Sequence, residues 1–372
     1  MRKFLLVLTA ACSLAAQERF AGSADIDRVI NLAVENDEMP GAVAWIGQGG
    51  KILHRKAYGS RSLLPASEPM TLDTIFDAAS LTKVVATTAS MMRLVEQGKV
   101  RLGDKVTVYL PNFQRGKSDI TVRMLLTHFS GMRPDVDLVP EWSGYETGIE
   151  KALIDKPVAA PGERFIYSDI NFVLLGEMVR RITGKPLDEF AREEVFLPVG
   201  MNESQFNPPA FLRPRIAPTE LYPKMAVPLR GSVHDPTARY MSGVAGHAGL
   251  FTTAADLSRF AQMLLNKGEL DGQRYFSPLT IAKFTQPQTP ADQPVLRGLG
   301  FDIDSQFSAN RGELFPLGDD HRSKQRQQHE DGDDDLRLAA GRSLSHGVRF
   351  ARPGVSRRQH HLHDCGYQQR AQ

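Results

Sequence analysis

Ser80 and Lys83 are three residues apart in the stretch Ser-Leu-Thr-Lys, and together they could perform acyl transfer. If a helix begins here, this spacing places the lysine amine beside the serine hydroxyl. A serine hydroxyl is a weak nucleophile at neutral pH, and a neighbouring amine that accepts its proton strengthens it. The helix N-terminus would add backbone N–H groups suited to a developing anion. The same pattern also arises by chance from a capping serine and a surface lysine, so the interpretation needs support from other segments.

Two further segments give that support. Tyr167 and Asp169 lie two apart on a turn before the apolar run that begins at Phe172, and His128 lies within residues 125–132, LLTHFSGM. Taken with the Ser80 motif, these segments resemble the serine hydrolases of the class C β-lactamase and penicillin-recognising family, in which S-x-x-K is an established motif. The resemblance covers residues from about 26 to about 318.

The resemblance implies a role for each of these side chains. Ser80 would form an acyl-enzyme with an ester or amide carbonyl, Lys83 would keep its hydroxyl activated, and Tyr167 would relay a proton to the leaving group. Asp169 departs from the pattern, because relatives more often carry asparagine there. An amide both donates and accepts hydrogen bonds, whereas a carboxylate only accepts. We therefore expect Asp169 to pair with Lys83 and to recognise β-lactams poorly.

The family's third catalytic element is a Lys/His-Thr/Ser-Gly triplet on a strand at the edge of the sheet, which supplies one N–H of the oxyanion hole. His247 and Gly249 are weak candidates for it. A helix-capping sequence follows them at 253–256, so we interpret the segment as a glycine loop that enters a helix. His128 is interpreted as structural, with its ring bonded to backbone at a helix end. We expect no cofactor and no metal.

Several elements are predicted around these residues. Apolar periodicity indicates helices over 25–36, 89–97 (continuing the Ser80 helix), 122–126, 172–182, 187–195, 257–266 and 277–284, a hairpin over 41–54 and a loop over 206–228. One hairpin is too small to form a stable sheet. The resemblance implies an α/β (α+β), β-lactamase-like fold, in which an antiparallel sheet flanked by helices faces a helical lobe across the active-site cleft. Its remaining strands would come from the C-terminal end.

The N-terminus predicts export. Arg2 and Lys3, the apolar residues 4–11 and the small residues 13–15 indicate a signal peptide over residues 1–16, and hence a periplasmic or secreted protein. Lipidation at Cys12 is less favoured, because Thr9 fits that motif poorly. The formal net charge of +2 gives no reason to expect nucleic acid as a partner. We expect no membrane span and a monomer.

The chain changes character after Gly318. Residues 17–318 are predicted to form the hydrolase domain, and residues 319–372 a polar, disordered tail with too few apolar residues to supply the missing C-terminal strands. Codons compatible with residues 344–349, read one base out of frame, spell Tyr-His-Thr-Gly-Phe, which contains the missing triplet. The sequence therefore favours a frameshift near Gly318 over a natural tail or a metal-binding tail around His360.

These observations predict an exported serine hydrolase that acts through Ser80 on an ester, a D-amino-acid peptide or a β-lactam, with a small molecule or peptidoglycan-like material as its partner. One alternative is a non-catalytic, cell-wall-binding relative, because the third triplet is missing. Another is a cell-wall amidase or glycosidase, although no carboxylate pair supports glycosidase chemistry.

Overall fold

The computed structural model describes residues 21–113, 116–222 and 225–308. All of them belong to the first of two units into which the chain divides, residues 1–318. The predicted signal peptide, the tail after Gly318, the missing strands and the frameshift therefore lie outside the described residues.

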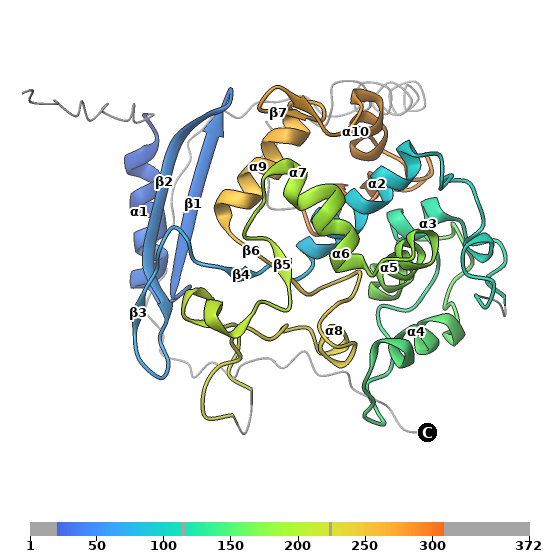
Figure 1. Ribbon diagram of the computed structural model, residues 1–372, viewed down its shortest axis with the longest axis horizontal. Coiled ribbons are helices and arrows are strands. Elements are labelled where there is room, and N and C mark those ends of the chain that lie inside the picture. The colour runs from blue at the N-terminus through green and yellow to red at the C-terminus, as the bar shows by residue number, and fades with distance from the viewer. Residues whose placement is uncertain (1–20, 114–115, 223–224, 309–372) are drawn as a thin grey trace, which may run out of the picture. The chain divides into compact units, whose positions relative to one another are not determined.

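An antiparallel hairpin opens the described fold. Strands β1 (Gly41–Gln48) and β2 (Lys51–Ser62) pair along their length, and β3 (Glu68–Pro69) adds to the other edge of β2. Gly49 and Gly50 make the turn at φ 56° and 75°, a left-handed conformation that glycine adopts without steric cost. Helix α1 (Ser23–Glu35) contacts β2, and α9 (Ala254–Leu265) contacts β1 from the opposite side (Figure 1). The predicted hairpin and first helix are confirmed.

A second, smaller sheet joins segments that are far apart in the sequence. Its order is β4 (Phe76–Asp77), β6 (Leu250–Thr252) and β5 (Gln205–Phe206), all antiparallel. Strand β4 ends three residues before Ser80, and β6 follows directly after residues 246–249. This sheet therefore fixes the start of the nucleophile segment against the Gly246–Gly249 loop.

The nucleophile helix is one continuous helix from 81 to 96, but its first part differs from the α-helix expected. The segment η1 (Lys83–Thr88) is π-helical, and α2 (Ala89–Glu96) continues it as regular α-helix. π-Helical segments are rare in proteins, and those that occur are often found at functional sites. Gly98, at φ 68°, follows the helix end as predicted.

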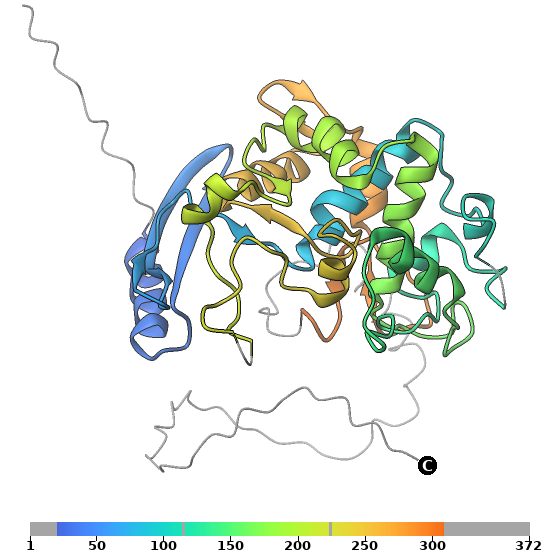
Figure 2. The same cartoon turned by 60° about the horizontal axis from the view of Figure 1, so that its bottom comes forward.

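The helical lobe surrounds this helix. It comprises α3 (Val122–Thr127), α4 (Tyr145–Ile154), α5 (Asp169–Thr183), α6 (Leu187–Ala191), the π-helical η3 (Arg192–Phe196) and α7 (Leu197–Val199). Met91 and Leu94 of α2 and Leu174 of α5 have no exposed surface. Each such side chain stabilises the fold by about 1.5–3 kcal/mol through burial. Figure 2 shows α2 enclosed by the neighbouring helices.

Short elements complete the described residues. They are η2 (Val106–Val108), η4 (Ala210–Arg215), α8 (Pro236–Tyr240), β7 (Glu269–Leu270), β8 (Gln273–Arg274), α10 (Pro278–Thr285), β9 (Leu296–Arg297) and β10 (Asp302–Asp304). The predicted helices near 257–266 and 277–284 begin at N-caps Thr253 and Ser277. The segment predicted as loop over 206–228 contains η4, which was missed. Within the described residues, no helix is long and apolar enough to cross a membrane.

Candidate active site

Ser80 stands on a tight turn between β4 and the nucleophile helix. The preceding residue, Ala79, has φ 45°, which is strained for a residue with a side chain. The Asp77 carboxylate holds this turn by accepting the Ala79 N–H at 2.8 Å. Thr82 donates its hydroxyl to the Ala79 carbonyl at 2.6 Å. The result is that Ser80 is exposed at the helix start, while Lys83 is only 3% exposed.

Lys83 Nζ has three polar contacts. It lies 2.9 Å from Ser80 Oγ, 2.6 Å from Asp169 Oδ1 and 3.2 Å from the backbone oxygen of His247. The ion pair with Asp169 is the one expected from the sequence. Asp169 is the first residue of α5, whose N-cap Ser168 accepts the Asn171 N–H, so the helix start fixes its position.

This geometry suits an amine that takes and holds a proton. An ammonium has three N–H donors, and three acceptors surround Nζ. In the neutral amine, two N–H groups can stay on the Asp169 carboxylate and the His247 carbonyl, which leaves the lone pair to face Ser80 Oγ. When Lys83 takes the Ser80 proton, the new positive charge forms beside an existing carboxylate. The arrangement can therefore activate Ser80 with little movement of its groups.

Tyr167 lies in the same cleft. Its ring centroid is 5.0 Å from Lys83 Nζ, and the ring stacks on His128 at 4.5 Å and 22°. The cleft has a volume of about 540 Å³. Its walls are formed by Ala78, Ala79, Ser80, Leu81, Lys83, Val84, Tyr167, Arg297, Gly300, Asp302 and Phe307. The structure thus brings Ser80, Lys83 and Tyr167 together, as the sequence analysis expected.

His128 has the contacts of a structural residue. It ends α3 in the left-handed conformation at φ 62°, and its Nδ1 accepts the Ser168 N–H at 3.0 Å. Burial, with smaller contributions from the charges of Arg297 and Lys83, holds the pKa of His128 well below its ordinary value. The ring is therefore neutral at physiological pH, and it packs against the Tyr167 ring by stacking.

The segment from Gly246 to Gly249 is a loop and not a strand. It leads into β6, which is the central strand of its sheet and not an edge strand. The capping Thr253 follows, as predicted. Gly249 has φ 117°, and a Cβ there would lie 2.4 Å from the Gly243 carbonyl oxygen, so only glycine fits. His247 contributes its backbone oxygen to Lys83, and its side chain bonds Asp235.

Asp235 is the partner of the His247 side chain. Its Oδ1 lies 2.8 Å from His247 Nε2, and it is the N-cap of α8. Burial would raise the pKa of Asp235, but the charge and hydrogen bond of His247 hold that pKa at about 2. Burial likewise opposes the charge on His247, yet Asp235 and Asp169 raise the pKa of His247 above its ordinary value.

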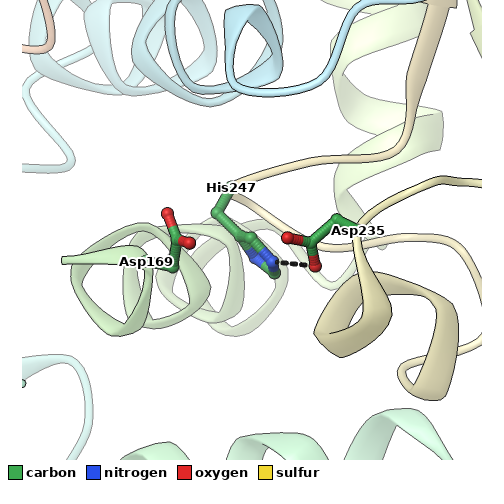
Figure 3. Close-up of side chains that lie close together, drawn as sticks. All are labelled: Asp169, Asp235 and His247. Carbon is green, nitrogen blue, oxygen red and sulfur yellow. Dashed lines mark hydrogen bonds and ion pairs between the residues drawn. The ribbon is translucent and has the colours of Figure 1, made fainter. Parts of the chain in front are cut away.

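Asp169, Asp235 and His247 converge closely enough to be considered as metal ligands. Figure 3 shows the two carboxylates on either side of the His247 ring, and one ligand atom from each residue lies within 4.8 Å of the others. The Lys83 ammonium already faces Asp169, and His247 already bonds Asp235. A metal cation would be repelled by that ammonium, so we interpret the group as an ion-pair network.

Sequence reasoning missed two residues of the site. The Asp-Pro pair at 235–236 is a helix-start signal, but nothing in it points to His247. Arg297 lines the same cleft as Ser80 while only 3% exposed, and its Nη1 lies 2.7 Å from Asp302 Oδ2. It stands in a short strand with no motif around it, so no signal in the sequence could have found it.

Known proteins resemble the chain over most of its length. The profile of the family described as Beta-lactamase matches residues 26–346. An N-acetylmuramyl-L-alanine amidase of Bacillus subtilis (strain 168) is 34% identical over 297 residues, covering 70% of this chain and 67% of that protein. A putative D-alanyl-D-alanine carboxypeptidase of Salmonella typhimurium is 31% identical over 283 residues, covering 68% of this chain and 65% of that protein. The chain therefore spans about two thirds of the length of these relatives. The profile match ends at residue 346, beyond Gly318, where the sequence analysis ended the resemblance.

Solved structures share the fold. A putative beta-lactamase from Bacteroides dorei DSM 17855 aligns with TM-score 0.56 and 25% identity over 72% of this chain and 70% of its own. The octameric penicillin-binding protein homologue from Pyrococcus abyssi aligns with TM-score 0.61 and 25% identity over 74% of this chain and 64% of its own. A class C beta lactamase from Rhodobacter sphaeroides reaches TM-score 0.59 at 18% identity over 75% and 74%, a likeness of fold alone.

Proposed function

The chain belongs to the β-lactamase family of serine hydrolases and has its α/β fold, and we propose that it works through an acyl-enzyme formed on Ser80. The observation that carries this proposal is the contact of Lys83 Nζ with Ser80 Oγ at 2.9 Å, with Asp169 Oδ1 2.6 Å from the same nitrogen. A capping serine and a surface lysine would not explain a lysine that is 97% buried and held by three oxygen atoms.

The proposed reaction has two halves. In acylation, Ser80 Oγ attacks the substrate carbonyl carbon and its proton passes to Lys83 Nζ, whose positive charge Asp169 stabilises. The tetrahedral oxyanion receives a hydrogen bond from the Ser80 backbone N–H, and the proton taken up by Lys83 passes through Tyr167 to the leaving group as the ester or amide bond breaks. In deacylation, water attacks the acyl carbon and gives one proton to Lys83. That proton returns to Ser80 Oγ as the bond between the acyl carbon and Oγ breaks, which releases the carboxylic acid and free Ser80.

The substrate we propose is an amide or ester in a peptidoglycan-derived peptide. The names of two relatives, an N-acetylmuramyl-L-alanine amidase and a putative D-alanyl-D-alanine carboxypeptidase, both describe cell-wall amide bonds. Asp169 can only accept hydrogen bonds, so it suits the lysine better than the amide of a β-lactam. Export, supported by the predicted signal peptide and by these relatives, would bring the enzyme to that material.

A substrate panel tests this function. Purified protein is assayed with p-nitrophenyl acetate, an acyl-D-Ala-D-Ala peptide, a muramyl dipeptide and a chromogenic cephalosporin. We expect ester turnover, cleavage of at least one of the two cell-wall compounds and poor cephalosporin turnover. Efficient cephalosporin hydrolysis would contradict the role given to Asp169, and activity that survives Ser80→Ala would contradict the mechanism.

One observation favours a non-catalytic alternative. Within residues 21–308, apart from the four that the structure does not describe, no strand beside Ser80 carries a Lys/His-Thr/Ser-Gly triplet. A protein without that strand could bind cell-wall peptides in the cleft and never turn them over. Such a binder would bind the muramyl or D-Ala-D-Ala compound by calorimetry yet form no covalent adduct with any ester.

A further inference from the structure

The Gly246–Gly249 loop is bonded directly to the nucleophile helix. Lys83 Nζ donates to the His247 carbonyl, and the Thr87 hydroxyl donates to the Gly246 carbonyl at 2.7 Å. The Leu250 N–H, just after the loop, donates to the Thr82 hydroxyl at 3.1 Å. A Cβ on Gly246 would lie 1.8 Å from the Phe172 carbonyl oxygen, so the loop is pressed against α5 as well. These contacts fix the backbone of His247 against the nucleophile helix.

The His247 ring lies at the centre of a buried charge network. The side chain is 1% exposed, and its Nδ1 has no hydrogen-bond partner among the described residues. Four charged groups act on it or lie beside it: Asp235 at the N-cap of α8, Asp169 at the start of α5, Lys83 in η1, and Asp135 in the loop before α4. Three of these four groups are acids.

These acids pose a problem for the proposed mechanism. Each negative charge near Lys83 favours the ammonium, whereas proton transfer from Ser80 needs the neutral amine. A second cation close to Lys83 would offset the carboxylates, because like charges at short range in a buried site repel each other. His247 is placed to be that cation. Its ring lies between the two carboxylates and bonds Asp235 on the side opposite Asp169 (Figure 3).

We propose that protonated His247, held by Asp235, is a positioning residue whose positive charge offsets the acids around Lys83 and so helps the lysine ammonium to release its proton. This inference rests on the proposed role of Ser80 and Lys83. The acids around His247, Asp235 first, favour the charged imidazole and raise its pKa in spite of its burial. His247 would therefore serve the reaction twice, through its backbone oxygen and through its ring.

The pH dependence of Ser80 acylation by a fluorophosphonate tests the proposal. His247→Gln removes the cation and leaves Asp235 uncompensated, so the acid limb of the acylation rate should move up by roughly one pH unit or more, making the reaction about tenfold slower below the limb. The double variant His247→Gln/Asp235→Asn removes that carboxylate too, and its limb should move back toward wild type. A merely structural role would give no such recovery.

The matched control is Thr87→Val, which deletes another hydrogen bond of the same loop without changing charge. It should retain the wild-type midpoint, even if acylation slows. A wild-type midpoint in His247→Gln, or a double variant shifted further than the single one, would overturn the proposal.

A second measurement avoids any variant of His247, in case that variant does not fold. The imidazole is titrated by NMR in wild type and in Lys83→Met. Loss of the lysine charge should move the His247 titration to higher pH, and an unchanged titration would overturn the proposal. If wild type shows no Ser80-dependent labelling at all, the proposed function fails, and this titration still decides the charge coupling.

Discussion

The N-terminal hairpin and the helical lobe differ in how completely their apolar side chains are covered. Among the described residues before Ile75, only Tyr58 and Met70 are buried apolar side chains, whereas α2 and α5 bury almost all of theirs. Strand β1 leaves its apolar residues half-exposed, and it pairs with no described strand other than β2. Within the described residues, the apolar side chains of the hairpin are therefore less completely buried than those of the helical lobe.

This difference separates the two halves of the proposed catalytic apparatus. Ser80, Lys83 and Asp169 are placed by the lobe and by the small β4–β6–β5 sheet, and their geometry is complete within the described residues. The family's third element would stand on a further strand of the hairpin sheet. The loop that holds His247 and Gly249 is not such a strand, and the out-of-frame His-Thr-Gly candidate lies after residue 308. The base that activates the nucleophile can thus be judged directly, while the second oxyanion donor stays a prediction.

The largest expected effect comes from the nucleophile Ser80, whose contacts lie entirely within the described residues. Ser80→Ala should lower kcat/KM for an ester by at least roughly two to three orders of magnitude, because the acyl-enzyme can no longer form. Ser67→Ala, an exposed serine of the hairpin region, is the matched control and should change kcat/KM little. Equal effects of the two changes would show that catalysis does not depend on the Ser80 hydroxyl.

The next effect concerns the second donor of the oxyanion hole. If the residues after Gly318 arise from a frameshift, a chain translated in the restored frame gains the His-Thr-Gly strand and one oxyanion donor. Such a donor contributes about 10²–10³ in kcat, so the restored chain should be faster by that factor. Resequencing the gene comes first, and native codons that do not spell the triplet in that frame would end this hypothesis.

Two core substitutions compare packing in the two regions. Leu174→Ala in α5 removes a fully buried side chain and should cost about 2–5 kcal/mol of unfolding free energy. Ile46→Ala in β1 removes a half-buried one and should cost roughly half as much or less. Urea unfolding of both variants measures the difference, and equal costs would mean that the hairpin is covered after all.

The smallest effect is a pH-dependent one from the network behind Lys83. Burial raises the pKa of Asp135 to about 6, above its unfolded value, so the folded protein binds this proton more tightly. The stability it contributes is full below the unfolded pKa and is lost as pH rises through about 6. Asp135→Asn should therefore raise the unfolding free energy near neutral pH by on the order of 1 kcal/mol, with the gain vanishing in acid.

Asp137→Asn is the control for that prediction. Its carboxylate pairs with Arg133 at 3.0 Å, and the hydrogen bond from Arg133 holds the pKa of Asp137 below its usual range. The charged form is thus the stabilising one, and this variant should gain nothing near neutral pH. A gain of similar size in both variants would show that general charge reduction is responsible.

Local signals made much of the site predictable. Ser80 and Lys83 are three residues apart, so one helix start brings them together whatever the rest of the chain does. The caps at Thr253 and Ser277 are also local, because each side chain accepts an N–H three residues later. The roles given to Tyr167 and Asp169 came from a family resemblance and not from spacing.

Contacts between distant segments were beyond sequence reasoning. Asp235 contacts His247 only because the chain turns back between α8 and β6, and no sequence pattern around either residue predicts this contact. Arg297 reaches the Ser80 cleft from more than 200 residues away. The π-helical start of the nucleophile helix was also missed, because its apolar residues fit the period of an ordinary α-helix.

The most direct test of the central claim is the site of covalent labelling. The purified protein is incubated with a fluorophosphonate, and the adduct is located by intact mass and peptide mapping, with Ser80→Ala in parallel. We predict one adduct per chain, on the peptide that contains Ser80, and none in the variant. An unlabelled wild type, or an adduct on another serine, would contradict the assignment of Ser80 as the nucleophile.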